Sequence, residues 1–405
     1  MKNNNKFNRR AFLKSIGFIG IGSTLTLGNC KNKPEDVYAK NNYPKVPTRR
    51  LGKTNLQVPI LNHGIMYNLI ENQIVIHNGL KWGINYIDTA NSYAGGNSEL
   101  GLGKFLSKFP EKRKDLIIVS KASRVKDSKS MEKKLQLSLK RMNTDYIDIY
   151  YGIHGLNDPG DLTNDIRKWA ESAKKRKLIK HFGFSTHKNM ANCLMAASKL
   201  DWIDVIMTSW NFHLMQERKM QNAIEACSKS DIGLVAMKIM GMEISSDGDY
   251  KLAKKFMDKG FTDGQVKLKI VLEDKRIATA CVTMPSAAMI TTNVAAVLDK
   301  KKLGRNEKNI LIKHAKSSCT QYCSGCSEIC DSALPEAPYI SDIMRYLMYF
   351  NNYNEQQKAK SLFLEEVPPN VRKNLLTYDY SSAELMCPKN LKIGEFIKEA
   401  VNKLA

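Results

Sequence analysis

The fold is decided by one stretch, Gly83-Ile84-Asn85-Tyr86-Ile87-Asp88-Thr89-Ala90-Asn91-Ser92-Tyr93. An apolar run of strand character ends at Asp88, and the polar loop that follows carries Tyr93. Two later apolar runs end in the same way, at Lys121 and at His154. Asp88, Lys121 and His154 are each 33 residues apart, about the length of one strand–helix unit. We therefore expect the three side chains to meet at the C-terminal rim of a parallel barrel, where barrel enzymes hold their catalytic groups.

Strands and helices alternate around this stretch. After a hairpin at 50–60, we expect strand ends near eight positions, at 63–66, 84–88, 116–121, 147–154, 181–185, 205–210, 234–238 and 278–284. Eight such units over roughly 240 residues predict an α/β fold, a closed (β/α)8 or TIM barrel. An open doubly wound sheet is the alternative, but it would require a glycine-rich phosphate turn after the first strand, and the sequence has none there.

The whole chain is long and strongly basic. Its 405 residues leave room for one barrel and a smaller appendage, and its net charge is +23. The lysines are spread along the chain and no nucleic-acid motif is present, so we expect no nucleic-acid partner. A solvated, lysine-rich surface is favoured over a dedicated polyanion site.

The N-terminus has the pattern of an export signal. The run Arg9-Arg10-Ala11-Phe12-Leu13-Lys14 precedes a short, mildly apolar stretch and resembles a twin-arginine signal. Cys30 follows a sequence similar to a lipoprotein cleavage box, which leaves both lipidation and attachment to a membrane surface open. The predicted location is the periplasm, or the outer side of the inner membrane.

The rim residues resemble those of the aldo-keto reductases. The pattern Asn85-Tyr86-Ile87-Asp88-Thr89-Ala90 with Tyr93, then Val119-Ser120-Lys121, then Ile153-His154, follows that family in order and spacing. The resemblance implies that Tyr93 donates a proton, that Lys121 and Asp88 support it, and that His154 orients the substrate carbonyl. The chemistry is consistent with this, because a neighbouring ammonium lowers the pKa of a phenol and a histidine can donate to a developing oxyanion.

The same resemblance implies NADP(H) or NAD(H) as the cofactor. Its contacts would come from Ser185 in a Gly-x-Ser turn, from Trp210 stacked on the nicotinamide ring, from Lys238 and Gly241 near the pyrophosphate, and from Asn293. A buried core aromatic is the other interpretation of Trp210. No basic residue lies between Ser286 and Asn293, where the family meets the 2′-phosphate, so NADP and NAD both stay open.

A cysteine cluster lies beyond the barrel. Its spacing, Cys319-x3-Cys323-x2-Cys326-x3-Cys330, resembles ferredoxin-type ligation, and Cys387 precedes Pro388 as the last cysteine of such runs does. We expect one [4Fe-4S] cluster held by Cys319, Cys323, Cys326 and Cys387, with Cys330 as the alternative fourth ligand. Zinc and disulfides are the competing interpretations.

The predicted organisation is a signal segment at 1–30, a linker at 31–45, a barrel at 46–305 and a small, mainly helical iron–sulfur segment at 306–405. The predicted function is nicotinamide-dependent reduction of an aldehyde or ketone, or the reverse oxidation of an alcohol. The cluster would be structural or would pass electrons to a partner. The alternative is a non-catalytic nucleotide-binding or scaffold subunit of an exported redox complex.

Overall fold

The computed structural model describes residues 43–123, 125, 127–240, 262–299, 304, 323–337, 339–352 and 355–405. The signal segment expected at 1–30, nearly all of the linker, Gly241 and Cys319 lie outside these residues.

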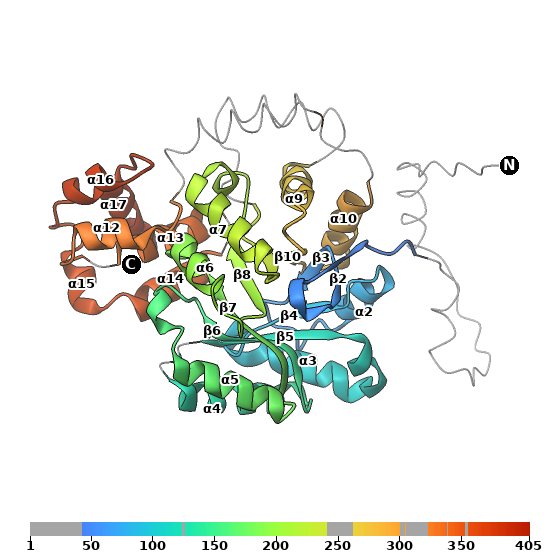
Figure 1. Ribbon diagram of the computed structural model, residues 1–405. Helices are drawn as coiled ribbons and strands as arrows, with labels where there is room; N and C mark the ends of the chain where they lie inside the picture. Colours follow the sequence, from blue (N-terminus) through green and yellow to red (C-terminus); the bar gives the residue numbers. More distant parts are fainter. Residues whose placement is uncertain are drawn as a thin grey trace. The chain divides into compact units, whose positions relative to one another are not determined.

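The described residues form a closed barrel of parallel strands, as the sequence predicts (Figure 1). The strands are β3 (Leu61–Gly64), β4 (Tyr86–Asp88), β5 (Ile117–Ser123), β6 (Ile147–His154), β7 (Ile179–Thr186), β8 (Val205–Ser209), β9 (Gly233–Met237) and β10 (Thr279–Thr283). Each pairs with the next, and β10 closes the ring by pairing with β3, Ala280 opposite Leu61. The strand ends fall within a few residues of the predicted positions.

The barrel helices are amphipathic and cover the outside of the ring. They are α2 (Ile74–Lys81), α3 (Asn97–Lys108), α4 (Ser128–Met142), α5 (Asn164–Lys175), α6 (Met190–Ala197), α7 (Arg218–Lys229), α9 (Asp263–Glu273) and α10 (Ala287–Leu298). In α4, Asp127 and Ser130 form a capping box, and Asn143 ends the helix in the left-handed region. The buried face of this helix carries Met131 and Leu135.

A short antiparallel hairpin, β1 (Thr48–Arg50) and β2 (Gln57–Pro59), precedes the barrel, as predicted. Its Leu51 and Val58 belong to the same apolar cluster as Tyr86 and Tyr151 of the barrel interior. Between β7 and β8 the strands approach so closely that a Cβ on Gly183 would lie 1.7 Å from the carbonyl oxygen of Val205. Only glycine fits at that position.

The chain ends in a bundle of short helices, here called the C-terminal bundle. It comprises α12 (Ser327–Ala333), α13 (Ile340–Asn352), α14 (Gln356–Glu366), α15 (Pro369–Asn374), α16 (Ser381–Met386) and α17 (Ile393–Leu404), coloured orange to red in Figure 1. It has its own apolar core, and α13 packs against both α14 and α17. Lys188, just after β7, is 2.7 Å from the carboxylate of Asp342 on α13, an ion pair that joins the bundle to the barrel.

Within the described residues, no helix is long and apolar enough to cross a membrane.

Candidate active site

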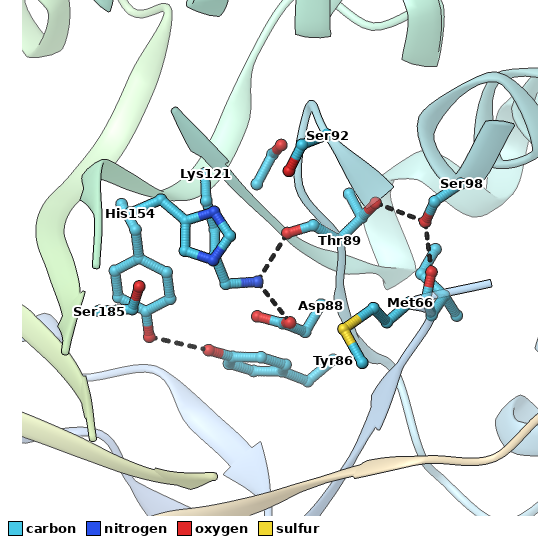
Figure 2. A network of polar contacts seen from close by, with 12 residues as sticks. Met66, Tyr86, Asp88, Thr89, Ser92, Ser98, Lys121, His154 and Ser185 are labelled. Atoms are coloured by element: carbon cyan, nitrogen blue, oxygen red, sulfur yellow. Dashed lines mark hydrogen bonds and ion pairs between the residues drawn. The ribbon is translucent and has the colours of Figure 1, made fainter. Parts of the chain in front are cut away.

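The centre of the site is a buried ion pair between neighbouring strands. The Lys121 Nζ donates to Asp88 Oδ1 at 2.5 Å and to the carbonyl oxygen of Thr89 at 2.7 Å (Figure 2). Lys121 and Asp88 are 1% and 2% exposed, so water screens their attraction very little. Burial raises the pKa of the Asp88 carboxyl, and the Lys121 ammonium opposes that rise. The barrel thus brings together two residues that the sequence spaces one unit apart.

Tyr93 is held at the rim by an unusual turn. It begins a short 3-10 helix, Tyr93–Gly96, in which Ala94 and Gly95 have positive φ angles of 49° and 64°. Gly96 follows at φ 100°, and a Cβ there would lie 2.6 Å from the Arg141 guanidinium carbon. Only glycine combines this backbone with such close approach.

Buried polar contacts fix the loop from below. The Thr89 and Ser98 hydroxyls are 2.6 Å apart, and Ser98 also donates to the carbonyl oxygen of Ile65 (Figure 2). Glu99, fully buried, accepts from the Ser120 hydroxyl at 2.7 Å and pairs with Arg141. The first turn of α3 therefore ties the Tyr93 loop to β5.

Tyr93 lies between Lys121 and His154. The Lys121 Nζ is 4.7 Å from the centroid of the Tyr93 ring, and the His154 ring meets the Tyr93 ring edge-on at 5.8 Å. Burial dominates the electrostatics of the phenol and raises its pKa well above the usual value, with Asp88 adding to the rise. The net shift is upward, because burial and the Asp88 carboxylate both raise the pKa of this phenol and outweigh the lowering expected from a neighbouring ammonium. Tyr93 is therefore a fully protonated phenol at neutral pH.

His154 is oriented by a serine. Its Nδ1 is 2.6 Å from the hydroxyl oxygen of Ser123, which in turn lies 2.8 Å from that of Ser92. Burial, then Lys121, lowers the pKa of His154 to about 3. The imidazole stays neutral, and with Nδ1 engaged by Ser123 its Nε2 can carry the proton offered to a substrate oxygen.

A cavity of about 950 Å³ opens above these residues. Its barrel side includes Tyr93, Lys121 and His154, and its other side is formed by α13 and α14. On α13 the cavity residues Asp342, Arg345 and Tyr349 share one helix face, and on α14 Lys358, Ser361, Leu362 and Glu365 do the same. The C-terminal bundle thus supplies part of the wall of the site.

The predicted cofactor residues divide into two groups. Ser185 and Lys238 line the cavity, and Lys238 has a left-handed backbone, φ 54°, of the kind that clusters at functional sites. Trp210 and Asn293 do not line it. Asn293 lies within α10 and donates to the carbonyl oxygen of Met289.

Trp210 has no exposed surface, and its indole Nε1 donates to Asp274 at 3.2 Å. In this structure Trp210 packs as a buried core aromatic, which is the alternative interpretation, and it does not line the cavity. Met237, at the end of the neighbouring strand β9, faces the cavity instead. Gly241 lies outside the described residues.

The described cysteines of the predicted cluster meet in one place. Cys323, Cys326, Cys330 and Cys387 all line a small cavity of about 20 Å³ in the C-terminal bundle. All four are free thiols, and burial raises the pKa of Cys323 and Cys326 to about 12. No group of three or more His, Cys, Asp or Glu side chains among the described residues is arranged to hold a metal ion. Cys319 lies outside those residues.

Several residues of the site were not predicted. Ser123 could have been found, because it lies two residues after Lys121 on the same strand and pairs in register with His154. Arg345, Tyr349 and Lys358 carry only a weak signal, because polar residues on surface helices are common and nothing local marks these as facing a cavity.

Comparison with known proteins agrees with this geometry. The model of the aldo/keto reductase family matches residues 68–303, more than half of the chain. An L-galactose dehydrogenase of Arabidopsis thaliana is 23% identical over 298 residues, which cover 66% of this chain and 92% of the plant protein. The NADP(+) aldo-keto reductase yakc of Schizosaccharomyces pombe is 25% identical over 267 residues. The match covers 58% of this chain and 75% of the length of yakc.

Solved structures are similar in fold. An aldo-keto reductase from Bacillus halodurans, in its holo form, has a TM-score of 0.55 and 22% identity, and covers 66% of this chain and 96% of its own. A thermostable aldo-keto reductase in complex with the inhibitor epalrestat has a TM-score of 0.55 and 24% identity. The match covers 66% of this chain and 98% of the reductase chain. The barrel, the sequence match and the buried Lys121–Asp88 pair lead to one conclusion: the chain belongs to the aldo/keto reductase family and is an NAD(P)-dependent oxidoreductase.

Proposed function

We propose that the chain reduces an aldehyde or ketone to an alcohol, or catalyses the reverse oxidation, with Tyr93 as the proton donor. One observation supports this most: a protonated phenol stands beside a buried ammonium and a neutral imidazole, all lining one cavity. A bound nicotinamide nucleotide would supply the hydride. Ser185 and Lys238 are the predicted cofactor residues placed to hold it, so the residues fit the nucleotide in part.

The side chains have separable roles in this reaction. His154 donates to the carbonyl oxygen and orients it toward Tyr93. Tyr93 gives its proton as the oxygen gains negative charge. Lys121, 4.7 Å from the phenol ring, then stabilises the phenolate, and Asp88 holds the ammonium in place. Lys121 and Asp88 are buried, which strengthens the interaction between their charges.

Fluorescence of NADPH bound to the purified protein tests this function. Addition of a reducible aldehyde should quench the signal with stoichiometric formation of alcohol. Stable fluorescence with every aldehyde and ketone tried, and with NADH in place of NADPH, would favour the alternative, a nucleotide-binding or scaffold subunit of a redox complex. The Asp88, Tyr93, Lys121 and His154 constellation argues against that alternative.

The cysteines support a second part of the proposal, one [4Fe-4S] cluster in the C-terminal bundle. We assign it to Cys319, Cys323, Cys326 and Cys387, with Cys330 as the alternative fourth ligand. The four described thiols line one cavity, which supports the assignment. Two of them, Cys323 and Cys387, are 64 positions apart in the sequence. Thiolates are the ligands that iron–sulfur clusters require. The cluster would fasten the bundle or pass single electrons to a partner.

Alanine substitutions at Cys387 and Cys330 distinguish the two fourth ligands. We expect Cys387→Ala to lose most of the iron and the low-temperature EPR signal of the reduced protein, and Cys330→Ala to keep both. Cys227→Ala, a change at a buried barrel cysteine, is the control. The reverse result would assign the position to Cys330, and zinc without iron in anaerobically purified wild type would refute the cluster.

Export is the third part of the proposal. The paired arginines Arg9 and Arg10 before a mild apolar stretch support the twin-arginine route, which carries folded proteins, to the periplasm or the outer side of the inner membrane. Cys30, if lipidated, would attach the protein to the membrane surface.

Substitution of Arg9 and Arg10 together by lysine tests the route. We expect the protein to remain in the cytoplasm, folded and loaded with cofactor, because the charge is kept and only the arginine pair is lost. Cell fractionation measures the outcome, and Lys2→Arg with Lys6→Arg is the matched control. Undiminished export of the double lysine variant would point to another route.

A further inference from the structure

Two buried polar groups in the cavity region have no hydrogen-bond partner among the described residues. They are the Nε of Arg345, on α13, and the Nδ1 of His187, just after β7. The side chain of Arg345 is only 15% exposed. Leaving such a group unpaired costs about 1–3 kcal/mol, so a fold that keeps two of them together is prepared for a ligand that bonds to them.

These residues share a second, smaller cavity beside the large one. It has a volume of about 30 Å³, and its lining includes Arg345, His187, Lys238, Ser209 and Ser341. Arg345, His187 and Lys238 also line the large cavity that holds Tyr93, so the two spaces adjoin. A molecule bound in the large cavity at Tyr93 has room to extend a group toward Arg345 and His187.

The guanidinium of Arg345 is held in a fixed position. Its Nη2 donates to Asp342 at 2.8 Å and to the hydroxyl of Tyr346 at 3.2 Å. Asp342 is itself fixed by Lys188. A planar guanidinium that is anchored at one nitrogen, with Nε unpaired, is suited to donate a hydrogen bond to a carboxylate oxygen.

Positive charge is in excess among the described residues that line the large cavity. The cations include Lys121, Arg141, Lys188, Lys238, Arg345 and Lys358. The acids that line it are already engaged: Asp342 by Lys188 and Arg345, Glu365 by Ser361, and Glu366 by Tyr346. Three of the cations, Lys121, Arg141 and Lys358, are paired with Asp88, Glu99 and Glu355, which do not line the cavity. Burial and then Lys121 lower the pKa of His154 most, and Lys358, Arg345 and Lys238 add to the lowering, so the charges of these cations act on the His154 ring.

We propose that Arg345, with His187, binds a carboxylate on the substrate, so that the preferred substrates are aldehydes or ketones that also carry an acid group. This inference rests on the proposed carbonyl reduction. In this proposal the C-terminal bundle forms one side of the cavity and also selects the substrate, through Arg345 of α13. The other source of an anion here is the pyrophosphate of the nucleotide, and the experiment below separates the two.

The test compares 4-carboxybenzaldehyde with 4-methylbenzaldehyde, which have nearly the same shape and differ in charge. Arg345→Met should lower kcat/KM for the acid about 100-fold, the value of a hydrogen-bonded charge pair. It should change kcat/KM for the methyl compound less than about threefold. Arg345→Lys keeps the positive charge but loses the planar arrangement of guanidinium donors. It should recover part of the lost kcat/KM for the acid. Arg167→Met, a change at an exposed arginine paired with Glu171, is the control.

Equal losses for the two aldehydes, or weaker NADPH binding by fluorescence titration in Arg345→Met, would mean that the arginine serves the nucleotide or the fold, and would overturn the proposal. Failure of the wild type to reduce either aldehyde would instead be a failure of the proposed function. Calorimetric binding of 4-carboxybenzyl alcohol then decides the subsite: loss of binding in Arg345→Met supports it, and unchanged binding refutes it. Should Arg345→Met not fold, Arg345→Lys carries the same comparison.

Discussion

Tyr93→Phe is expected to lower kcat for carbonyl reduction by about 10²–10⁴-fold while nucleotide binding stays nearly unchanged. The substitution removes one oxygen from a ring that is otherwise held by the same turn and the same neighbours. A phenol that serves only as a proton donor contributes in the transition state and not in the ground state, so its loss appears in turnover and not in affinity. Steady-state kinetics and NADPH fluorescence titration measure the two quantities separately.

The control for this substitution is Tyr378→Phe, because Tyr378 packs against the core of the C-terminal bundle and does not line the cavity. It should leave kcat unchanged. A Tyr93→Phe enzyme that turns over within a few-fold of wild type would remove Tyr93 from the role of acid and leave His154 or a water to supply the proton.

Lys121→Met is expected to destabilise the protein by about 3–5 kcal/mol as well as to abolish reduction. Methionine keeps the length of the chain but leaves Asp88 buried at 2% exposure without its ammonium partner. A buried carboxylate without a partner either lowers the free energy of unfolding or takes up a proton. Urea denaturation followed by circular dichroism gives the change in the free energy of unfolding.

Two further variants make this result specific. Lys121→Met combined with Asp88→Asn should be more stable than Lys121→Met alone, because the buried charge is removed with its partner. Lys229→Met breaks an exposed pair with Glu225 and should cost about 0–1 kcal/mol. A Lys121→Met protein as stable as the Lys229→Met protein would show that the buried pair contributes little to folding.

The barrel and its central residues could be predicted because they depend on local sequence. Asp88, Lys121 and His154 each end an apolar run, and once the strands are parallel and adjacent their ends must meet. The strand ends themselves follow from the same apolar runs. These signals need no knowledge of how distant parts of the chain pack.

The rest of the site depends on packing that no local pattern records. Arg345 and Lys358 reach the cavity only because the C-terminal bundle docks beside the barrel mouth. The position of Trp210 was decided by a contact with Asp274, which is 64 residues away. The pKa of Tyr93 likewise depends first on burial and then on the nearby Asp88, neither of which can be read from the position of Lys121 in the sequence.

The pairing of β10 with β3 has a consequence for how the chain is synthesised. The strand that completes the ring, Thr279–Thr283, lies more than two hundred residues after the strand it joins, Leu61–Gly64. Until a ribosome has released the later strand, β3 has an unpaired edge that other chains could add to. Contacts between such distant segments form slowly, because a long loop must first close. We expect the emerging chain to depend on chaperones until β10 is available, and ring closure to be the late step of its folding.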